Sequence, residues 1–185
     1  LFGACRGDDA ASRRDAAMLA IFLSSGLRRS EAVALDVADY DPKAGRLHIR
    51  GEKPENDRLV TLRAPARAAL AQWLLVRTDA PGPLLLPVDR GGLVKFRRMT
   101  DQALYDIFGR ITNRAGVSSL SLRDLRRSYV LGLIRAGHDA KQTQYLVGHA
   151  SWLTTAMYTT LAKQTTAKFY DLDALPYRPP QPARS

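Results

Sequence analysis

The chain has 185 residues, 45% of them hydrophobic, which predicts one domain of ordinary size with a sizeable core. Its 28 lysines and arginines outnumber its 18 aspartates and glutamates, and the net charge of +10 favours an anionic partner, either nucleic acid or a membrane surface. The single cysteine, Cys5, excludes an internal disulfide framework and any multi-cysteine metal site, and three widely spaced histidines argue against a structural zinc.

The sequence contains neither a predicted membrane span nor a secretion signal. The longest apolar stretch near the N-terminus, Ala16–Leu23, is far shorter than the roughly 20 residues that a spanning helix needs. No basic segment leads into an apolar region with a cleavage site. We therefore expect no membrane association and a cytoplasmic location. Because the chain begins with Leu1 rather than methionine, we also expect a fragment of a longer protein.

The first part of the chain predicts two helices. Asp9–Leu23 carries part of an apolar stripe, with Ser12 as a candidate N-cap, and Gly26 interrupts the pattern. A second, shorter helix is expected over Ser30–Leu35, with Ser30 as its N-cap and Glu31 in its first turn.

The middle of the chain predicts a hairpin, a helix and a loop. Arg46–Arg50 alternates between apolar and polar residues as a half-buried strand does, and Arg58–Leu62 is a weaker copy. The segment Gly51–Asp57 between them has the composition of a hairpin loop. Pro65 predicts the start of a helix that extends to Arg77, and Thr78–Gly92 is rich in proline and glycine and predicts a long loop.

The second half of the chain is predicted to be helical. Thr100 caps a helix that ends near Gly116, and Ser121 begins a capping box for a helix that ends at Gly137. Further helices are expected over Asp139–Val147, Leu153–Thr160 and Lys163–Asp173. The whole pattern predicts a mainly α (α+β) fold, a helical bundle with one small antiparallel hairpin sheet. The tail, residues 176–185, has four prolines and is expected to be extended and mobile.

Three clusters of residues could carry chemistry. Arg28 stands where a loop enters a helix, which suits a phosphate oxygen, and Glu31 one turn later could orient its guanidinium. Arg123 and Arg126 share one helix face, and a bound anion would relieve their mutual repulsion. His149 follows the helix end at Gly148, nine residues before Tyr158. Each cluster alone also fits a structural role: a surface ion pair, a solvated basic face, and a hydrogen-bonded histidine with a packed tyrosine.

In combination the clusters are far more specific. Gly26-Leu27-Arg28-Arg29-Ser30-Glu31, Lys53 in a hairpin loop, Arg126, Leu146-Val147-Gly148-His149 and Tyr158 follow one another in this order. This ordered set resembles the catalytic domain of tyrosine recombinases, the phage integrase family, and in particular their Xer-like branch. The resemblance covers about residues 1–165. It implies a catalytic domain at residues 1–175 without the family's N-terminal core-binding domain.

The resemblance also implies a role for each site residue. A phosphodiester is anionic, and nucleophilic attack places further charge on its non-bridging oxygens, so preorganised cations stabilise the transition state. The implied roles are Tyr158 as the nucleophile that forms a 3′-phosphotyrosyl intermediate, Lys53 as general acid, Arg28 and Arg126 as a phosphate clamp, His149 as a hydrogen-bonding partner of the phosphate or the tyrosine proton, and Glu31 as a support. No metal, cofactor or ATP is expected, because the phosphotyrosine bond retains the energy of the broken DNA bond.

Arg123 departs from the family pattern. At this position, three residues before the second arginine, the family usually has histidine or, less often, lysine. Neutral histidine can accept a proton, whereas arginine cannot. Arg123 could still donate hydrogen bonds to phosphate or stabilise a phenolate, and His149 or a water would then accept the proton of Tyr158. We expect slower cleavage or a shifted pH optimum.

Two other functions compete with an active site-specific recombinase or integrase. A degenerate relative could bind DNA without cutting it, and a nicking–closing enzyme similar to type IB topoisomerases could use the same residue types. The intact Tyr158 argues against the first, and the Gly148-His149 pair with its spacing argues against the second. The resemblance implies double-stranded DNA as the partner, a homo-tetramer on DNA for the full-length protein, a monomeric fragment without DNA, and a bacterial nucleoid-associated location. The expected helix Lys163–Asp173 could pack on a neighbouring protomer or on its own chain.

Overall fold

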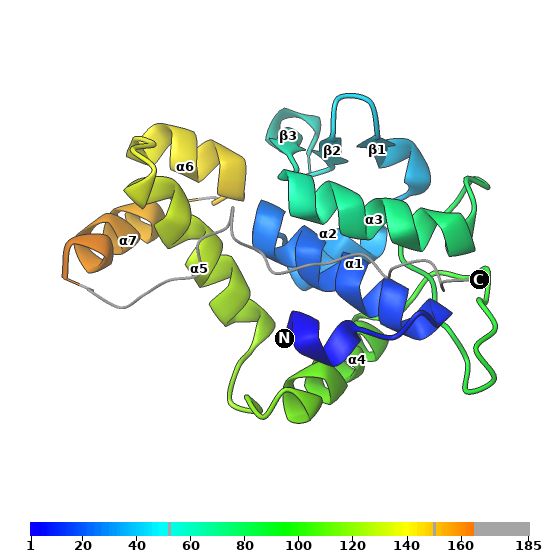
Figure 1. Cartoon of the computed structure of the whole chain (residues 1–185). Helices are drawn as coiled ribbons and strands as arrows, with labels where there is room; N and C mark the ends of the chain where they lie inside the picture. The colour runs from blue at the N-terminus through cyan, green and yellow to red at the C-terminus, as the bar shows by residue number, and fades with distance from the viewer. Residues whose placement is uncertain (52, 150, 165–185) are drawn as a thin grey trace.

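The computed structural model describes residues 1–51, 53–149 and 151–164 (Figure 1). Its α-helices are α1 (Ala10–Ser25), α2 (Arg29–Ala34), α3 (Ala64–Arg77), α4 (Asp101–Arg114), α5 (Leu122–Arg135), α6 (Ala140–Val147) and α7 (Trp152–Gln164). The strands are β1 (Tyr40–Asp41), β2 (Arg46–Ile49) and β3 (Arg58–Thr61), and short 3-10 turns are η1 (Phe2–Cys5), η2 (Val37–Asp39) and η3 (Pro54–Asn56). The expected helix Lys163–Asp173 falls almost wholly outside the described residues, and the tail 176–185 does so entirely.

Helix α1 is the central element of the core. Every residue from Ala16 to Leu23 is at most 4% exposed, so this segment of the helix is apolar and buried on all sides rather than on one stripe. Helix α3 packs along it and contributes the buried Trp73, and α5 packs against another side. Burial of this extent fixes the C-terminal end of α1, where the candidate site begins.

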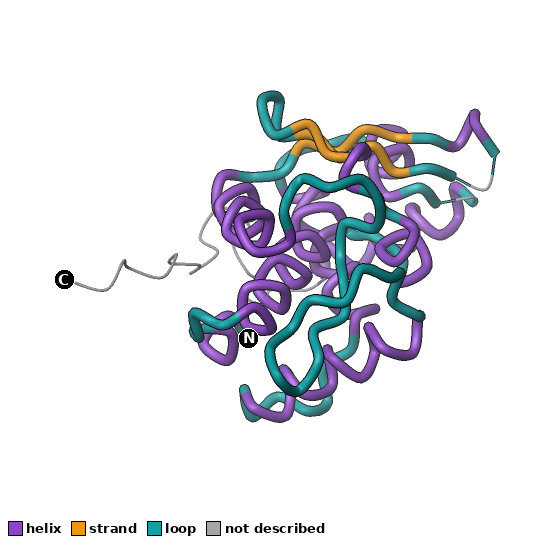
Figure 2. The backbone as a smooth tube through the Cα atoms, turned by 90° about the vertical axis from the view of Figure 1, so that its right-hand side faces the viewer, coloured by secondary structure: helices purple, strands orange, loops and turns teal. Residues whose placement is uncertain are grey.

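A small antiparallel sheet with the order β1–β2–β3 covers one edge of the helices, as Figure 2 shows in orange. Leu47 pairs with Val60 and Ile49 pairs with Arg58 across β2 and β3. These four side chains are buried, whereas Leu59 between two of them is exposed, as the two-residue period of a strand requires. An arginine therefore occupies the buried face of the sheet.

Helices α5, α6 and α7 lie together at one side of the molecule, beyond α1 and the sheet (Figure 1). Helix α7 packs on both α5 and α6, and α6 also contacts β3. These contacts bring the C-terminal end of α6 beside the hairpin and the end of α1, although the three segments are far apart in the sequence.

The structure confirms the mainly α fold with a small antiparallel sheet. The caps at Thr100, Ser121 and Asp139 are present, because each side chain accepts a hydrogen bond from a first-turn backbone N–H group. Two expected caps were wrong.

The first wrong cap is that of α1, which Asp9 provides instead of Ser12. The Asp9 carboxylate accepts from the Ser12 backbone N–H at 3.0 Å and from its hydroxyl at 2.7 Å, so Ser12 is a donor within the first turn. The second is that of α2, which begins at Arg29 with Arg28 rather than Ser30 at the N-cap. The two-residue strand β1 was not predicted, because so short a strand has no periodic pattern. Among the described residues, no helix is both long enough and apolar enough to cross a membrane.

Candidate active site

Two glycines at helix ends form the backbone frame of the site. Gly26 ends α1 at φ +58° and Gly148 ends α6 at φ +69°, both in the left-handed region that glycine adopts without strain. A Cβ atom at Gly26 would lie 2.4 Å from the Tyr129 ring, so the position is sterically closed as well. The carbonyl oxygens at these two helix ends carry partial negative charge and accept hydrogen bonds from arginines.

Arg28 is held between a carboxylate and a helix end. Its Nη1 atom donates to Glu31 Oε1 at 3.1 Å, and its Nη2 atom donates to the Gly148 carbonyl at 2.5 Å. The Arg28 backbone N–H also donates to Glu31 Oε2 at 2.6 Å. The Arg28 side chain is 47% exposed although these hydrogen bonds fix its position, so an anion can reach it from solvent.

Arg126 lies deeper and faces the same two helix ends. It donates to the Gly26 carbonyl at 2.6 Å and to the Val147 carbonyl at 2.9 Å. Burial, and then the charge of Arg28, lower the pKa of Arg126 to about 10. The side chain is still a cation at neutral pH, and a bound anion would relieve the repulsion between the two arginines.

His149 and Tyr158 stand side by side in the site. Their rings stack with centroids 5.9 Å apart and an angle of 17° between the planes. The His149 Nδ1 atom lies 2.9 Å from the hydroxyl oxygen of Thr155, which is fully buried on α7. Burial, with the charges of Arg126, Arg28 and Arg58, lowers the pKa of His149 to about 4. The imidazole is therefore neutral at physiological pH.

A cavity of about 680 Å³ joins these groups. Its lining comes from the segment between α1 and α2, from α5, and from the region of α7, and consists of Leu27, Arg28, Arg29, Leu122, Arg123, Arg126, His149, Ser151, Thr154 and Tyr158. Four arginines and no carboxylate are in this lining, so the cavity suits an anion. Arg123 is exposed at its edge, with Arg126 one helical turn further along α5.

Lys53 lies outside this cavity. It is exposed in the hairpin loop, immediately before the turn η3, and its backbone carbonyl accepts from the Asn56 backbone N–H at 2.9 Å. A second cavity of about 540 Å³ lies between the hairpin and α6 and shares Arg28 and His149 with the first. The structure thus brings five of the expected site residues to one cavity, with Glu31 holding Arg28 and with Lys53 on a neighbouring loop.

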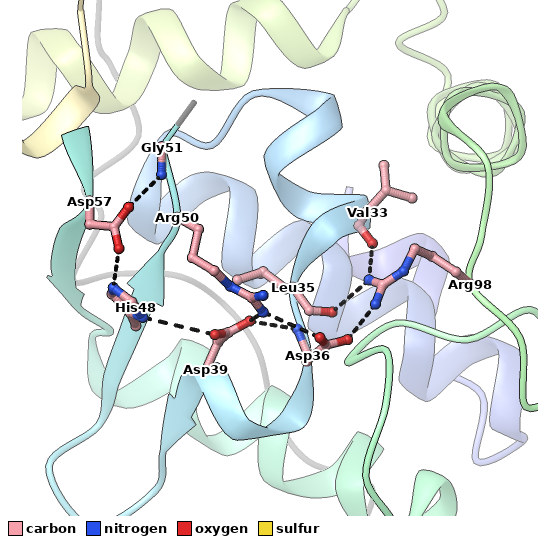
Figure 3. A network of polar contacts seen from close by, with 9 residues as sticks. All are labelled: Val33, Leu35, Asp36, Asp39, His48, Arg50, Gly51, Asp57 and Arg98. Atoms are coloured by element: carbon pink, nitrogen blue, oxygen red, sulfur yellow. Dashed lines mark hydrogen bonds and ion pairs between the residues drawn. The ribbon is translucent and has the colours of Figure 1, made fainter. Parts of the chain in front are cut away.

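The base of the Lys53 loop is closed by a polar network, shown in Figure 3. Asp57 accepts from the Gly51 backbone N–H at 2.9 Å and lies 3.0 Å from His48 Nε2. The other ring nitrogen of His48 is 3.9 Å from Asp39. The network continues through Arg50, which donates to Asp39 and Asp36, and Arg98, which donates to Asp36 and to the carbonyls of Val33 and Leu35.

Two residues of the site were not predicted from the sequence. Arg58 is 2% exposed and binds both oxygens of Glu31 at 2.9 Å, and Thr155 binds His149. One feature of the sequence indicated that Arg58 is buried. It alternates with Val60 and Leu62, so it lies on the same face as two buried apolar residues. No sequence pattern identifies Thr155, since several threonines lie nearby.

Comparison with known proteins identifies the family of the chain. Residues 1–165 match the phage integrase family, and the chain belongs to that family. The tyrosine recombinase XerC of Azotobacter vinelandii is 38% identical over 169 residues, which cover 89% of this chain and 54% of the relative. XerC of Pseudomonas aeruginosa strain LESB58 is 37% identical, with coverage of 89% and 53%. The chain thus spans about half the length of the curated relatives that it matches.

Solved structures have the same fold. A crystal structure of XerA recombinase superposes with a TM-score of 0.70 at 21% identity, over 88% of this chain and 58% of that one. XerH recombinase bound to its palindromic difH substrate, in a post-cleavage complex, gives a TM-score of 0.65 at 28% identity, over 84% and 44%.

Proposed function

We propose that residues 1–175 are the catalytic domain of a site-specific DNA recombinase, which breaks and rejoins DNA strands through a 3′-phosphotyrosyl intermediate. One observation carries the proposal: Arg28, Arg126, His149 and Tyr158, spread over 131 positions of the sequence, line one basic cavity. These residues are among those by which the sequence resembles the phage integrase family, to which the chain belongs.

Double-stranded DNA is the proposed substrate. Two structural neighbours are DNA complexes: XerH is bound to difH, and a Tn1549 transposon integrase is bound to circular intermediate DNA. The net charge of +10 and the arginine-lined cavity give this chain the corresponding electrostatics. We further propose assembly of the full-length protein as a tetramer on DNA, and action in the bacterial cytoplasm at the nucleoid.

Arg28 and Arg126 provide the phosphate clamp. Arg28 and Arg126 are each anchored by a backbone carbonyl at a helix end, so little reorganisation accompanies phosphate binding. Their charges neutralise the non-bridging oxygens as the phosphorane forms, and loss of one such donor lowers the rate by about 10²- to 10³-fold in comparable sites. Arg123, at the edge of the cavity, donates a further hydrogen bond to the phosphate or the phenolate.

Tyr158 attacks phosphorus through its phenolic oxygen, which breaks the bond to the 5′-oxygen and leaves the 3′-phosphate on the enzyme. Neutral His149 accepts the tyrosine proton or forms a hydrogen bond with the phosphate, because Thr155 fixes its ring through Nδ1. Lys53, which is exposed on the hairpin loop, protonates the leaving 5′-oxygen. Attack by another 5′-hydroxyl then reverses the step and rejoins the strands.

The proposal is tested by covalent trapping. The chain is mixed at low salt with nicked suicide duplexes of randomised centre, beside a Tyr158→Phe variant, and the denatured products are separated by size. We expect a protein–DNA adduct that the variant lacks. Absence of the adduct in a protein that binds DNA contradicts the proposal. If Arg123→His then forms the adduct, the degenerate alternative is favoured. Relaxation of any supercoiled plasmid would favour the topoisomerase alternative.

A further inference from the structure

Arg58 lies beneath the proposed active site, on the strand that follows the Lys53 loop. It is 2% exposed, and its two terminal nitrogens bind the two oxygens of Glu31, both at 2.9 Å. Its Nε atom donates to the Leu146 carbonyl, at the end of α6, at 3.2 Å. One side chain thus connects β3, the start of α2 and the end of α6.

We propose that Arg58 is a positioning residue that holds Arg28 and His149 in a single frame and couples that frame to the hairpin of Lys53. The inference rests on the recombinase function proposed above, because it assigns Arg58 a part in that reaction. Arg58 does not line the cavity that contains Tyr158, so it acts through the groups it binds.

Glu31 transmits the effect to Arg28. A carboxylate that bound Arg28 alone could rotate with it, and the exposed guanidinium would then sample several positions. The fork of Arg58 fixes both oxygens of Glu31, and these same oxygens accept from the Arg28 side chain and backbone. The Arg28 side chain therefore loses its conformational entropy when the protein folds rather than when the transition state forms.

Gly148 transmits the effect to His149. A Cβ atom at Gly148 would lie 2.7 Å from Arg58 Nη1, so the peptide before His149 rests directly on the Arg58 guanidinium. The Gly148 carbonyl accepts from Arg28 on its other side. Arg58 and Arg28 thus enclose this peptide, and a displaced Arg58 would move the His149 ring relative to Tyr158.

Lysine cannot replace arginine in this role. A planar fork with a third N–H group can satisfy two carboxylate oxygens and a carbonyl at once, whereas an ammonium group presents one compact charge. A buried cation is tolerated only when it is fully paired, which the Glu31 contacts achieve.

The test compares Arg58→Lys with the wild-type chain and with Arg46→Lys. Arg46 is an exposed arginine at the opposite end of the same β2–β3 ladder, so it controls for an arginine-to-lysine change in this sheet. We measure the rate of adduct formation on the suicide duplex at saturating DNA, the DNA dissociation constant and the melting temperature. For Arg58→Lys we expect a rate about 10- to 100-fold lower with DNA affinity retained, and for Arg46→Lys no change in rate.

If the role of Arg58 were purely structural, Arg58→Lys would lower the melting temperature, but the folded variant would form the adduct at the wild-type rate. That result overturns the proposal. If Arg58→Lys does not fold, the double variant Arg58→Met/Glu31→Gln replaces it, because it leaves no unpaired buried charge. A folded double variant that cleaves at the wild-type rate also overturns the proposal.

A second measurement uses no catalysis, so the inference and the recombinase function can fail separately. In the free chain, the pKa of His149 is followed by NMR titration. Arg58→Met removes one of the three positive charges that lower the pKa of His149, so we expect that pKa to rise. If the wild-type chain forms no adduct, the recombinase proposal fails, and the titration alone decides on Arg58. An unchanged pKa of His149 in folded Arg58→Met contradicts the inference.

Discussion

At the scale of single residues, the proton on His149 links the site to the stability of the fold. Burial and three arginines lower the pKa of His149 from 6.5 to about 4. As the pH falls below 6.5, the unfolded chain binds this proton before the folded chain does, so folding stability decreases until the pH reaches about 4. The stability that neutral His149 provides is present in full above its unfolded pKa.

This difference predicts a pH-dependent loss of stability that His149→Gln lacks. After allowance for water around the half-buried ring, His149 should contribute about 1 kcal/mol to the change in unfolding free energy between pH 7 and pH 5. Urea unfolding of both proteins at the two pH values measures this contribution. The other titrating groups are the same in both proteins, so the difference between the two pH dependences belongs to His149. An equal pH dependence in the two proteins would show that His149 titrates normally.

At the scale of an element, the hairpin combines an exposed tip with a fixed base. Lys53 is exposed at the tip, while Asp57 joins the Gly51 backbone to His48 at the base. Asp57→Ala removes both contacts and leaves the loop to sample more conformations. We expect the protonation of the leaving group to slow by about 10-fold, a part of the roughly 10²- to 10⁴-fold that general acid catalysis contributes.

A change of leaving group separates this effect from other damage. A DNA with sulfur in place of the bridging 5′-oxygen releases a thiol, which is far more acidic than an alcohol (about 8.5 for the pKa of the cysteine thiol) and leaves without a general acid. Asp57→Ala should therefore cleave the sulfur-containing DNA at nearly the wild-type rate. Asp57→Asn keeps a hydrogen-bonding side chain and should restore much of the activity on ordinary DNA. Equal losses on both DNAs would instead mean that the fold or the phosphate clamp is damaged.

Local signals explain which elements could be predicted from the sequence. Helices with a side-chain cap, such as those after Thr100, Ser121 and Asp139, depend on interactions within four residues and begin where expected. The role of Arg58 depends on partners 27 and 88 positions away, which no local pattern encodes. The residues that resemble the family's ordered set could be identified from the sequence. The position of Lys53 outside the cavity could not, because it depends on how the hairpin is oriented.

At the scale of the whole molecule, the site exists only where distant parts of the chain meet. The first half contributes Arg28, Glu31 and Arg58, and the second half contributes Arg126, His149 and Tyr158. Helix α1 and the sheet hold the first set, and α5 to α7 hold the second (Figure 1). The positive charges of both parts face one cavity, so its potential is a property of the assembled fold.

This arrangement predicts a steep dependence of DNA binding on salt. If the four arginines that line the cavity each neutralise one phosphate, the logarithm of the binding constant should fall with the logarithm of salt concentration at a slope of about −3.6. A rise from 50 to 200 mM salt then weakens binding by about 150-fold. Fluorescence anisotropy with a labelled duplex measures the slope, and Arg123→Gln should reduce its magnitude by about one. A slope near −1 would mean that the cavity does not receive the DNA backbone, because a single phosphate contact would then account for the binding.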